Sequence, residues 1–121
     1  MAKKSLSLLL VVGVVVACST GDKKKEQAQL FLQNGTGHLV KGQFPQALSS
    51  LLHAEELDPK NPVIHNNLGL TYYMRKEYPL AIKHFREALD IDSKFTDARN
   101  NLGRLYISTG DLDLAVTELN E

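Results

Sequence analysis

The chain has 121 residues, which is room for one small domain, and its 14 basic residues balance its 14 acidic residues. Lys3 and Lys4 lie in a leader that we expect to be removed, which would leave 12 basic residues against 14 acidic ones. A mildly acidic chain without a basic stripe argues against a nucleic-acid partner. An ordinary apolar content of 43%, with no tryptophan, argues against a protein with several membrane spans.

Residues 1–17 have the pattern of an export signal. Lys3 and Lys4 precede an apolar run over residues 6–16, which is too short to span a bilayer and typical of a signal-peptide core. The run ends in Val-Val-Ala-Cys at 15–18, which resembles a bacterial lipobox. That resemblance implies cleavage before Cys18, acylation of its thiol and attachment to a membrane through the lipid.

Cys18 is the only cysteine, so it has no disulfide partner within the chain, and the alternative is an ordinary cysteine in a leader. In such lipoproteins an aspartate after the cysteine often retains the protein at the inner membrane, whereas this chain has Ser19. We therefore expect a place on the periplasmic side of the outer membrane, in a cell that has one. Residues 19–27 contain no apolar side chain, which predicts a flexible tether from the lipidated Cys18 to residue 27.

The remaining residues contain three matched stretches, at 28–61, 62–95 and 96–121. Gly69 in the middle stretch has counterparts 34 positions away in both directions, at Gly35 and Gly103. Three more sets of residues share this spacing: Ala47, Ala81 and Ala115; Leu51, Phe85 and Leu119; His38, Tyr72 and Tyr106. A fixed period of this length, with two helical patterns in each unit, is typical of a helical repeat array.

In the middle unit, apolar residues recur at helical intervals and predict two helices of about 12 to 14 residues, joined near Lys76 and Glu77. Small residues stand where the two helices should cross closely. They are Gly69 in the first helix and Ala81 and Ala88 in the second. Each helix pair leaves apolar surface uncovered, so it needs a neighbouring pair to complete its core.

On these markers the units look like tetratricopeptide repeats. The first unit departs from the family pattern at Asn34 and His38, and the second has Lys76 in place of a turn glycine and Ser93 in place of a closing proline. The resemblance implies an all-α fold. The expected architecture is a right-handed superhelix of antiparallel helix pairs, with about five to six helices and an incomplete third repeat.

The third unit stops at Glu121, before its last turn, and no polar capping helix follows. The uncapped end of a repeat array exposes an apolar face. We therefore expect that the chain is the front of a longer array or closes its end by self-association.

Catalytic and metal-binding patterns are scarce. His38 and His65 occupy positions where the repeat pattern puts aromatic residues, which predicts that they pack, while His53 and His84 fall on second helices. No His-Glu-x-x-His or Cys-x-x-Cys spacing indicates a zinc site. The sequence therefore predicts no catalytic residue, no metal and no cofactor, and favours a binding protein over an enzyme.

Within the family, the first helix of each unit lines a concave groove. Contacts come from the position two before the repeat glycine and from positions one, four and five after it. Residues at these positions include Gln33, Asn67, Asn101, Leu70, Tyr73, Met74 and Arg104. The resemblance implies a ladder of amides that holds an extended peptide backbone, beside apolar surface suited to an apolar peptide or helix. The alternative is that the asparagines only suit the start of a helix.

An exported lipoprotein built of such repeats resembles the pilotins of type IV pili, which help the secretin ring reach and assemble in the outer membrane. That resemblance implies a scaffold that brings an apolar segment of a secretin subunit to the membrane. Two alternatives stay open: an adaptor that gathers periplasmic enzymes such as cell-wall hydrolases, and a structural envelope lipoprotein.

Overall fold

The computed structural model describes the backbone of residues 2–121 and the side chains from Ser19 onward. Over these residues the fold consists of helices without a strand, as the all-α prediction requires. The helices are α1 (Ala2–Val40), α2 (Phe44–Leu57), α3 (Pro62–Met74), α4 (Tyr78–Ile91), α5 (Thr96–Thr109) and α6 (Leu112–Asn120).

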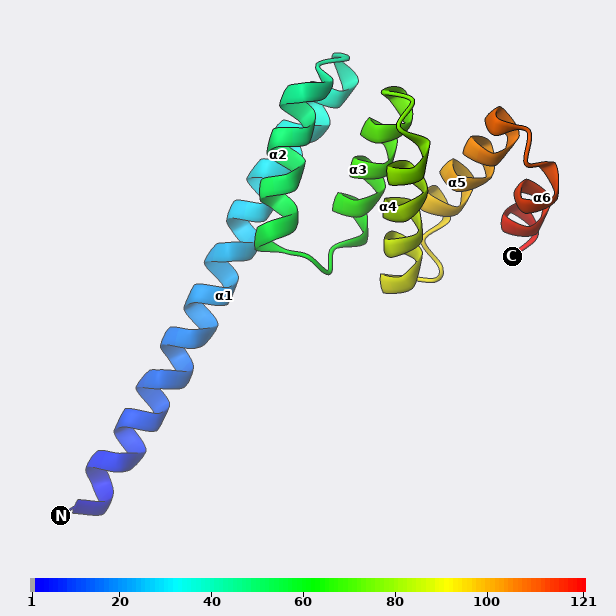
Figure 1. Ribbon diagram of the computed structural model, residues 1–121. Helices are drawn as coiled ribbons and strands as arrows, with labels where there is room; N and C mark the ends of the chain where they lie inside the picture. Colours follow the sequence, from blue (N-terminus) through cyan, green and yellow to red (C-terminus); the bar gives the residue numbers. More distant parts are fainter. Residues whose placement is uncertain (1) are drawn as a thin grey trace.

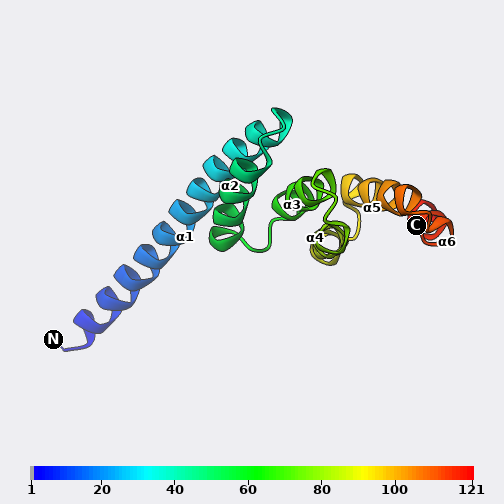
Figure 2. The same cartoon turned by 45° about the horizontal axis from the view of Figure 1, so that its top comes forward.

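The helices form three antiparallel pairs, α1 with α2, α3 with α4, and α5 with α6 (Figure 1). The pairs follow one another in chain order, and the two ends of the chain lie at opposite ends of the molecule (Figures 1 and 2). Contacts also join α2 to α3 and α4 to α5, so each pair packs on the next one. The 34-residue unit of the sequence is therefore one helix pair of the structure.

Residues 19–27 are helical and belong to α1, whereas the sequence predicts a flexible tether there. The segment is rich in lysine with glutamate and glutamine, which propagate a helix readily, and Gly21 alone does not end it. Ala28 and Leu32, which follow, are buried. Because nucleation is the costly step of helix formation, this packed part of α1 supports the exposed turns before it.

The predicted leader and the Cys18 thiol lie outside the residues whose side chains are described. Cleavage before Cys18 and its acylation therefore stay predictions. Within the part of the chain that the structure describes, no helix is long and apolar enough to cross a membrane.

The turn inside each unit has a left-handed backbone at the same repeat position. Gly42, Lys76 and Gly110 have φ angles of 71°, 62° and 86°. Glycine adopts this conformation at little cost, whereas a lysine pays a steric penalty. The second unit thus keeps the family turn geometry although its sequence departs from glycine at Lys76.

Three of the helices, α2, α3 and α4, have a proline in their first turn. Pro45, Pro62 and Pro79 all stand in the first turn of a helix, where the missing N–H has no helical partner. At the junction between the first two units, the Asn61 side chain accepts a hydrogen bond from the Val63 amide at 3.0 Å. This cap fixes the start of α3 and so the entry of the second helix pair.

Each helix pair closes on a glycine of its first helix. A methyl group on Gly69 would lie 2.6 Å from two ring carbons of Phe85, and Gly35 and Gly103 have the same relation to leucines of α2 and α6. Phe85 is fully buried and belongs to a cluster with Leu102, Leu105 and Tyr106 of α5. The ring that contacts Gly69 therefore also joins the second pair to the third.

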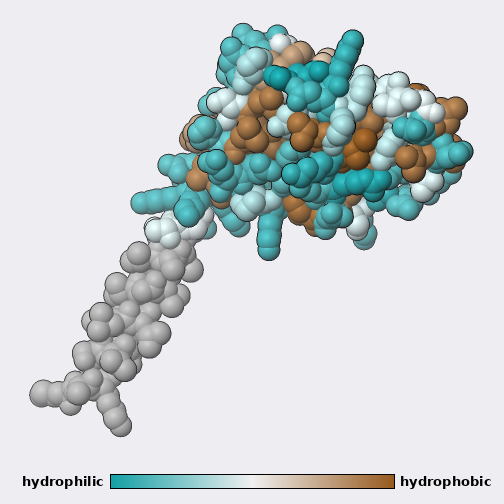
Figure 3. All heavy atoms as spheres, in the orientation of Figure 1, coloured by the Kyte–Doolittle hydropathy of each residue, from teal (hydrophilic) through white to brown (hydrophobic). Residues whose placement is uncertain are grey.

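The last helix exposes several apolar side chains. Leu112, Leu114, Val116 and Leu119 are between 47% and 61% exposed, and Figure 3 shows apolar surface at this end of the molecule. The expected self-association of this end stays a prediction.

The crossing contact at Gly69 predicts a stability effect. Gly69→Ala forces the Phe85 ring to shift and should lower the free energy of unfolding by about 1–3 kcal/mol, measured by urea denaturation. Gly37→Ala is the matched control because a Cβ there meets nothing within 4 Å. In a helix this control should raise stability by about 0.5–1 kcal/mol. Equal effects of the two substitutions would contradict the crossing contact.

Candidate functional site

A small pocket lies between α3, α4 and α5. Its volume is about 70 Å³, and it is lined by Leu70, Tyr73, Met74, Phe85, Asn101 and Arg104. Five of these six residues are among the groove residues that the sequence predicts, and α3 contacts α5 directly. Three predicted groove residues of the second unit and two of the third therefore meet at one place.

The pocket is mostly apolar with one cation at its wall. Leu70, Tyr73 and the buried Phe85 ring provide the apolar lining, Met74 is 54% exposed, and Arg104 carries the charge. Sites for small molecules are usually about 300–1,000 Å³, several times larger than this pocket. Its size and lining suit one short apolar side chain of a protein partner rather than a small-molecule substrate.

The other two predicted groove residues do not line this pocket. Gln33 is exposed on α1, and Asn67 is largely buried on α3. The Asn67 side-chain NH₂ donates a hydrogen bond to Thr36 Oγ1 at 2.8 Å. Asn101 in the next unit donates in the same way to Asn66 Oδ1 at 2.9 Å.

These two amides connect the first helices of consecutive units, α3 to α1 and α5 to α3. An amide whose NH₂ already donates inside the protein has less capacity left for a peptide backbone. The peptide ladder stays a prediction. The bridging between units is a third role, which neither the ladder interpretation nor the helix-start interpretation of the sequence included. A regular 34-residue spacing of asparagines is compatible with both roles.

The bridge between α3 and α5 predicts a structural effect of Asn101. Asn101→Ala removes the donor to Asn66 Oδ1 and should lower the free energy of unfolding by about 1–2 kcal/mol in urea denaturation. Gln33→Ala, at the exposed equivalent position of α1, is the control and should change stability by less than about 0.5 kcal/mol. Unchanged stability of the Asn101 variant, with loss of partner binding, would favour the peptide ladder instead.

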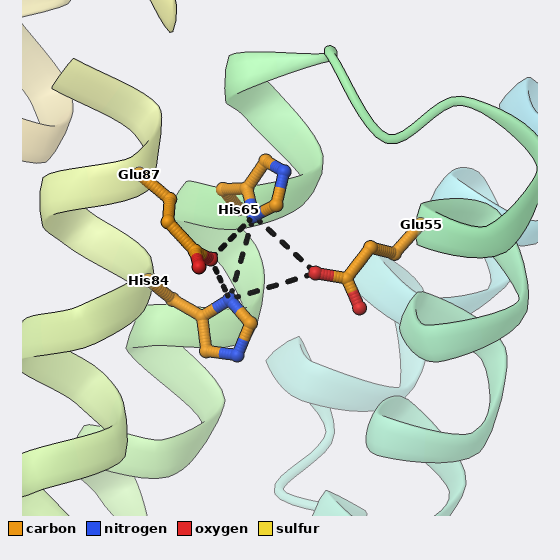
Figure 4. A group of neighbouring side chains, drawn as sticks. All are labelled: Glu55, His65, His84 and Glu87. Atoms are coloured by element: carbon orange, nitrogen blue, oxygen red, sulfur yellow. Dashed lines mark hydrogen bonds and ion pairs between the residues drawn. The ribbon is translucent and has the colours of Figure 1, made fainter. Parts of the chain in front are cut away.

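A second group of polar side chains lies between α2, α3 and α4. Glu55 of α2, His65 of α3, and His84 and Glu87 of α4 point toward one another (Figure 4). One nitrogen or oxygen atom from each residue lies within 4.8 Å of the other three. The imidazole side chains are only 7% exposed, and those of Glu55 and Glu87 are 27% and 36% exposed.

Backbone and ring contacts hold both imidazoles. The His65 Nε2 lies 2.7 Å from the Pro59 carbonyl oxygen, and since a carbonyl only accepts, this nitrogen donates. The His84 ring stacks on His65 on one side, with centroids 5.7 Å apart, and on Tyr72 at 5.4 Å. Burial lowers the pKa of His84 to about 4 and outweighs the opposite effect of Glu87, so this imidazole is neutral at pH 7.

The sequence predicted packing for His65, and its burial and stacking confirm this, but the grouping with the carboxylates was missed. His38 differs, because it is only partly buried and its Nδ1 lies 2.7 Å from Gln43 Oε1. The one local signal was the spacing of His84 and Glu87, which puts them on one face of a helix. Their partners come from two other helices, so no short motif contains the group.

Three family models match overlapping or adjacent parts of the chain. A tetratricopeptide repeat model matches residues 62–95, a TPR repeat model matches 39–75, and another tetratricopeptide repeat model matches 96–121. The chain is built of tetratricopeptide repeats (TPRs). This confirms the fold that the sequence resemblance implies, and repeat arrays of this kind typically serve as protein-binding scaffolds.

Solved structures of similar fold include the second TPR of Spaghetti (RPAP3) bound to an HSP90 peptide. It is 20% identical with a TM-score of 0.78, over 84% of this chain and 94% of that chain. The Arabidopsis OM64 TPR domain is 18% identical with a TM-score of 0.77, over 80% of each chain. At these identities the likeness concerns the fold alone.

Pseudomonas aeruginosa pilF is 29% identical with a TM-score of 0.76 over 80% of this chain. The match covers 44% of that chain, so this chain corresponds to less than half of pilF. No curated protein sequence matches the chain.

Proposed function

We propose that this TPR chain is an envelope lipoprotein that holds an apolar segment of a protein partner in the pocket between α3 and α5. The observation that carries the proposal is the meeting of Leu70, Tyr73 and Met74 with Arg104 in one small pocket on the first helices. An acylated Cys18 would tie this binding surface to the outer membrane. The function would then be to bring the partner to that membrane.

The pocket defines the chemistry of the bound segment. One apolar side chain fits the space beside Tyr73, and the Met74 thioether adapts to different shapes because it is unbranched and exposed. Arg104 can donate hydrogen bonds to a carbonyl or carboxylate of the same segment. A single arginine does not make the group of several basic residues that fixes a C-terminal carboxylate, so an internal apolar segment fits better than an acidic peptide end.

For the partner itself, we propose a secretin subunit, in a role like that of the type IV pilus pilotins. The lipobox at 15–18 and the similarity to Pseudomonas aeruginosa pilF over four-fifths of this chain support this choice. The RPAP3 repeat bound to an HSP90 peptide shows that the same fold elsewhere holds a peptide. An adaptor for cell-wall hydrolases is the competing function, and it would use the same pocket.

A charge in the pocket should abolish partner binding without unfolding the protein. Met74→Glu places a carboxylate at the exposed rim, and we expect the yield of crosslinked partner in envelope fractions to fall about ten-fold or more. Leu80→Glu on α4 is the control, since this partly exposed leucine does not line the pocket. It should leave the yield unchanged.

The identity of the partner is tested in a deletion strain. Secretin multimers should be reduced there and restored by the unaltered chain and by Leu80→Glu, but not by Met74→Glu. Normal assembly and localisation of the multimers without the protein would end the secretin proposal. Crosslinks to a cell-wall hydrolase that disappear with Met74→Glu would then support the adaptor.

The lipid anchor is tested at the leader. Cys18→Ser removes the thiol that accepts the lipid, so incorporation of labelled palmitate should be lost and the uncleaved precursor should accumulate. Because two or three acyl chains at about 0.8 kcal/mol per methylene hold a protein firmly, the unaltered chain should stay with membranes in high salt. Ser19→Asp keeps acylation and should move the protein to the inner membrane. Palmitate incorporation by the Cys18→Ser variant would contradict the anchor.

A further inference from the structure

We propose that Glu55, His65, His84 and Glu87 form a binding site for a divalent transition metal ion of the Zn²⁺ class, which joins the first repeat to the second. The site lies away from the partner pocket and does not depend on the proposed function. Its residues come from α2, α3 and α4, so a bound ion would connect three helices (Figure 4).

Five of the six distances between the four facing atoms are known individually, and four of these five are close to those of a tetrahedral ligand set. His65 Nδ1 lies 3.4 Å from His84 Nδ1, 3.4 Å from Glu55 Oε1 and 3.2 Å from Glu87 Oε2. His84 Nδ1 lies 3.2 Å from the same Glu87 oxygen and 3.9 Å from Glu55 Oε1. A zinc site with bonds of about 2.0–2.2 Å has ligand-to-ligand distances of about 3.3–3.6 Å. The four atoms thus need only small shifts to hold one ion.

The hydrogen bond from the second ring nitrogen of His65 to a backbone carbonyl is one that metal-binding histidines usually make. Its Nε2 donates to the Pro59 carbonyl oxygen, which leaves the lone pair of Nδ1 directed toward the group in a neutral ring. That lone pair faces Glu55 Oε1 and Glu87 Oε2, and both of these carboxylate oxygens only accept. The Glu87 oxygen is buried and has no hydrogen-bond donor of good geometry. A cation bound between these atoms would satisfy both carboxylates and the imidazole lone pair.

The equivalent place in the third unit contains a permanent cation. The residues 34 positions after His65, His84 and Glu87 are Arg99, Glu118 and Glu121. Arg99 Nη1 lies 2.8 Å from a Glu121 oxygen and 3.8 Å from a Glu118 oxygen, so its guanidinium balances the carboxylates.

The second unit has the His65 imidazole where the third has this arginine. The lysine beside it, Lys83, lies at the exposed edge, with its Nζ 3.9 Å from the other oxygen of Glu87. A divalent ion would balance the two carboxylates of Glu55 and Glu87 as Arg99 balances those of the third unit.

The ligand set defines the metal and its role. Two imidazole nitrogens with two carboxylate oxygens suit Zn²⁺ and its first-row neighbours, whereas Mg²⁺ and Ca²⁺ prefer oxygen ligands alone. Four protein ligands close a tetrahedral site, which is the arrangement of structural rather than catalytic zinc. The ion would therefore fix the angle between the first and second helix pairs.

The test uses the full, untagged chain in detergent, freed of metal with a chelator. We expect one Zn²⁺ per chain in calorimetric titration, a rise in Tm of about 5 °C or more with excess Zn²⁺, and the intense visible absorption of four-coordinate Co²⁺. Glu87→Gln keeps the shape of the half-exposed side chain and should weaken Zn²⁺ binding by at least about ten-fold.

Glu121→Gln is the matched control, because it makes the same change 34 residues later, in the arginine group. It should leave Zn²⁺ affinity and the Co²⁺ spectrum unchanged. The proposal is overturned if the folded chain, with its normal helical circular dichroism, shows no Zn²⁺ binding and no Tm shift. An equal Zn²⁺ response in the Glu87→Gln and Glu121→Gln variants overturns it as well.

Discussion

The structure depends on the close crossing of two helices at a glycine in each repeat. Gly35, Gly69 and Gly103 each meet a large apolar side chain of the second helix at a distance that leaves no room for a Cβ. In the middle unit that side chain is Phe85, which also lines the small pocket between α3, α4 and α5 and contacts α5 in the core. The contact that closes the pair thus also shapes that pocket.

Apolar contacts close each pair and join it to the next, and polar contacts cross the same junctions. On the groove side, Asn67 and Asn101 connect consecutive first helices, and between α2 and α4 the four-residue histidine–glutamate group spans the junction of the first two units. Hydrogen bonds are directional, while apolar packing is not. They therefore suit the task of fixing the angle between repeats, on which the shape of a long groove depends.

One place in the repeat carries three different chemistries. In the first unit Phe31 stacks on His53 with ring centroids 5.3 Å apart, in the second two imidazoles meet two carboxylates, and in the third Arg99 pairs with glutamates. A repeat contacts only its neighbours, so a change at one junction leaves the others intact. The scaffold can thus acquire a local site without altering its fold.

The sequence by itself determined the period, the helix pairs and the glycine crossings, because these repeat at a fixed spacing along one chain. Its resemblance to a known family implied a groove, and five of the predicted groove residues line the pocket. The sequence failed at residues 19–27, where a polar composition indicated a tether, while packing of Ala28 and Leu32 supports a continuous helix. Only the tertiary structure decided which atoms accept the hydrogen bonds of the Asn67 and Asn101 amides. It alone also brings together Glu55 and Glu87, which are 32 positions apart in the sequence. Such contacts depend on how the pairs are turned against each other, and the residues of one helix do not encode that angle.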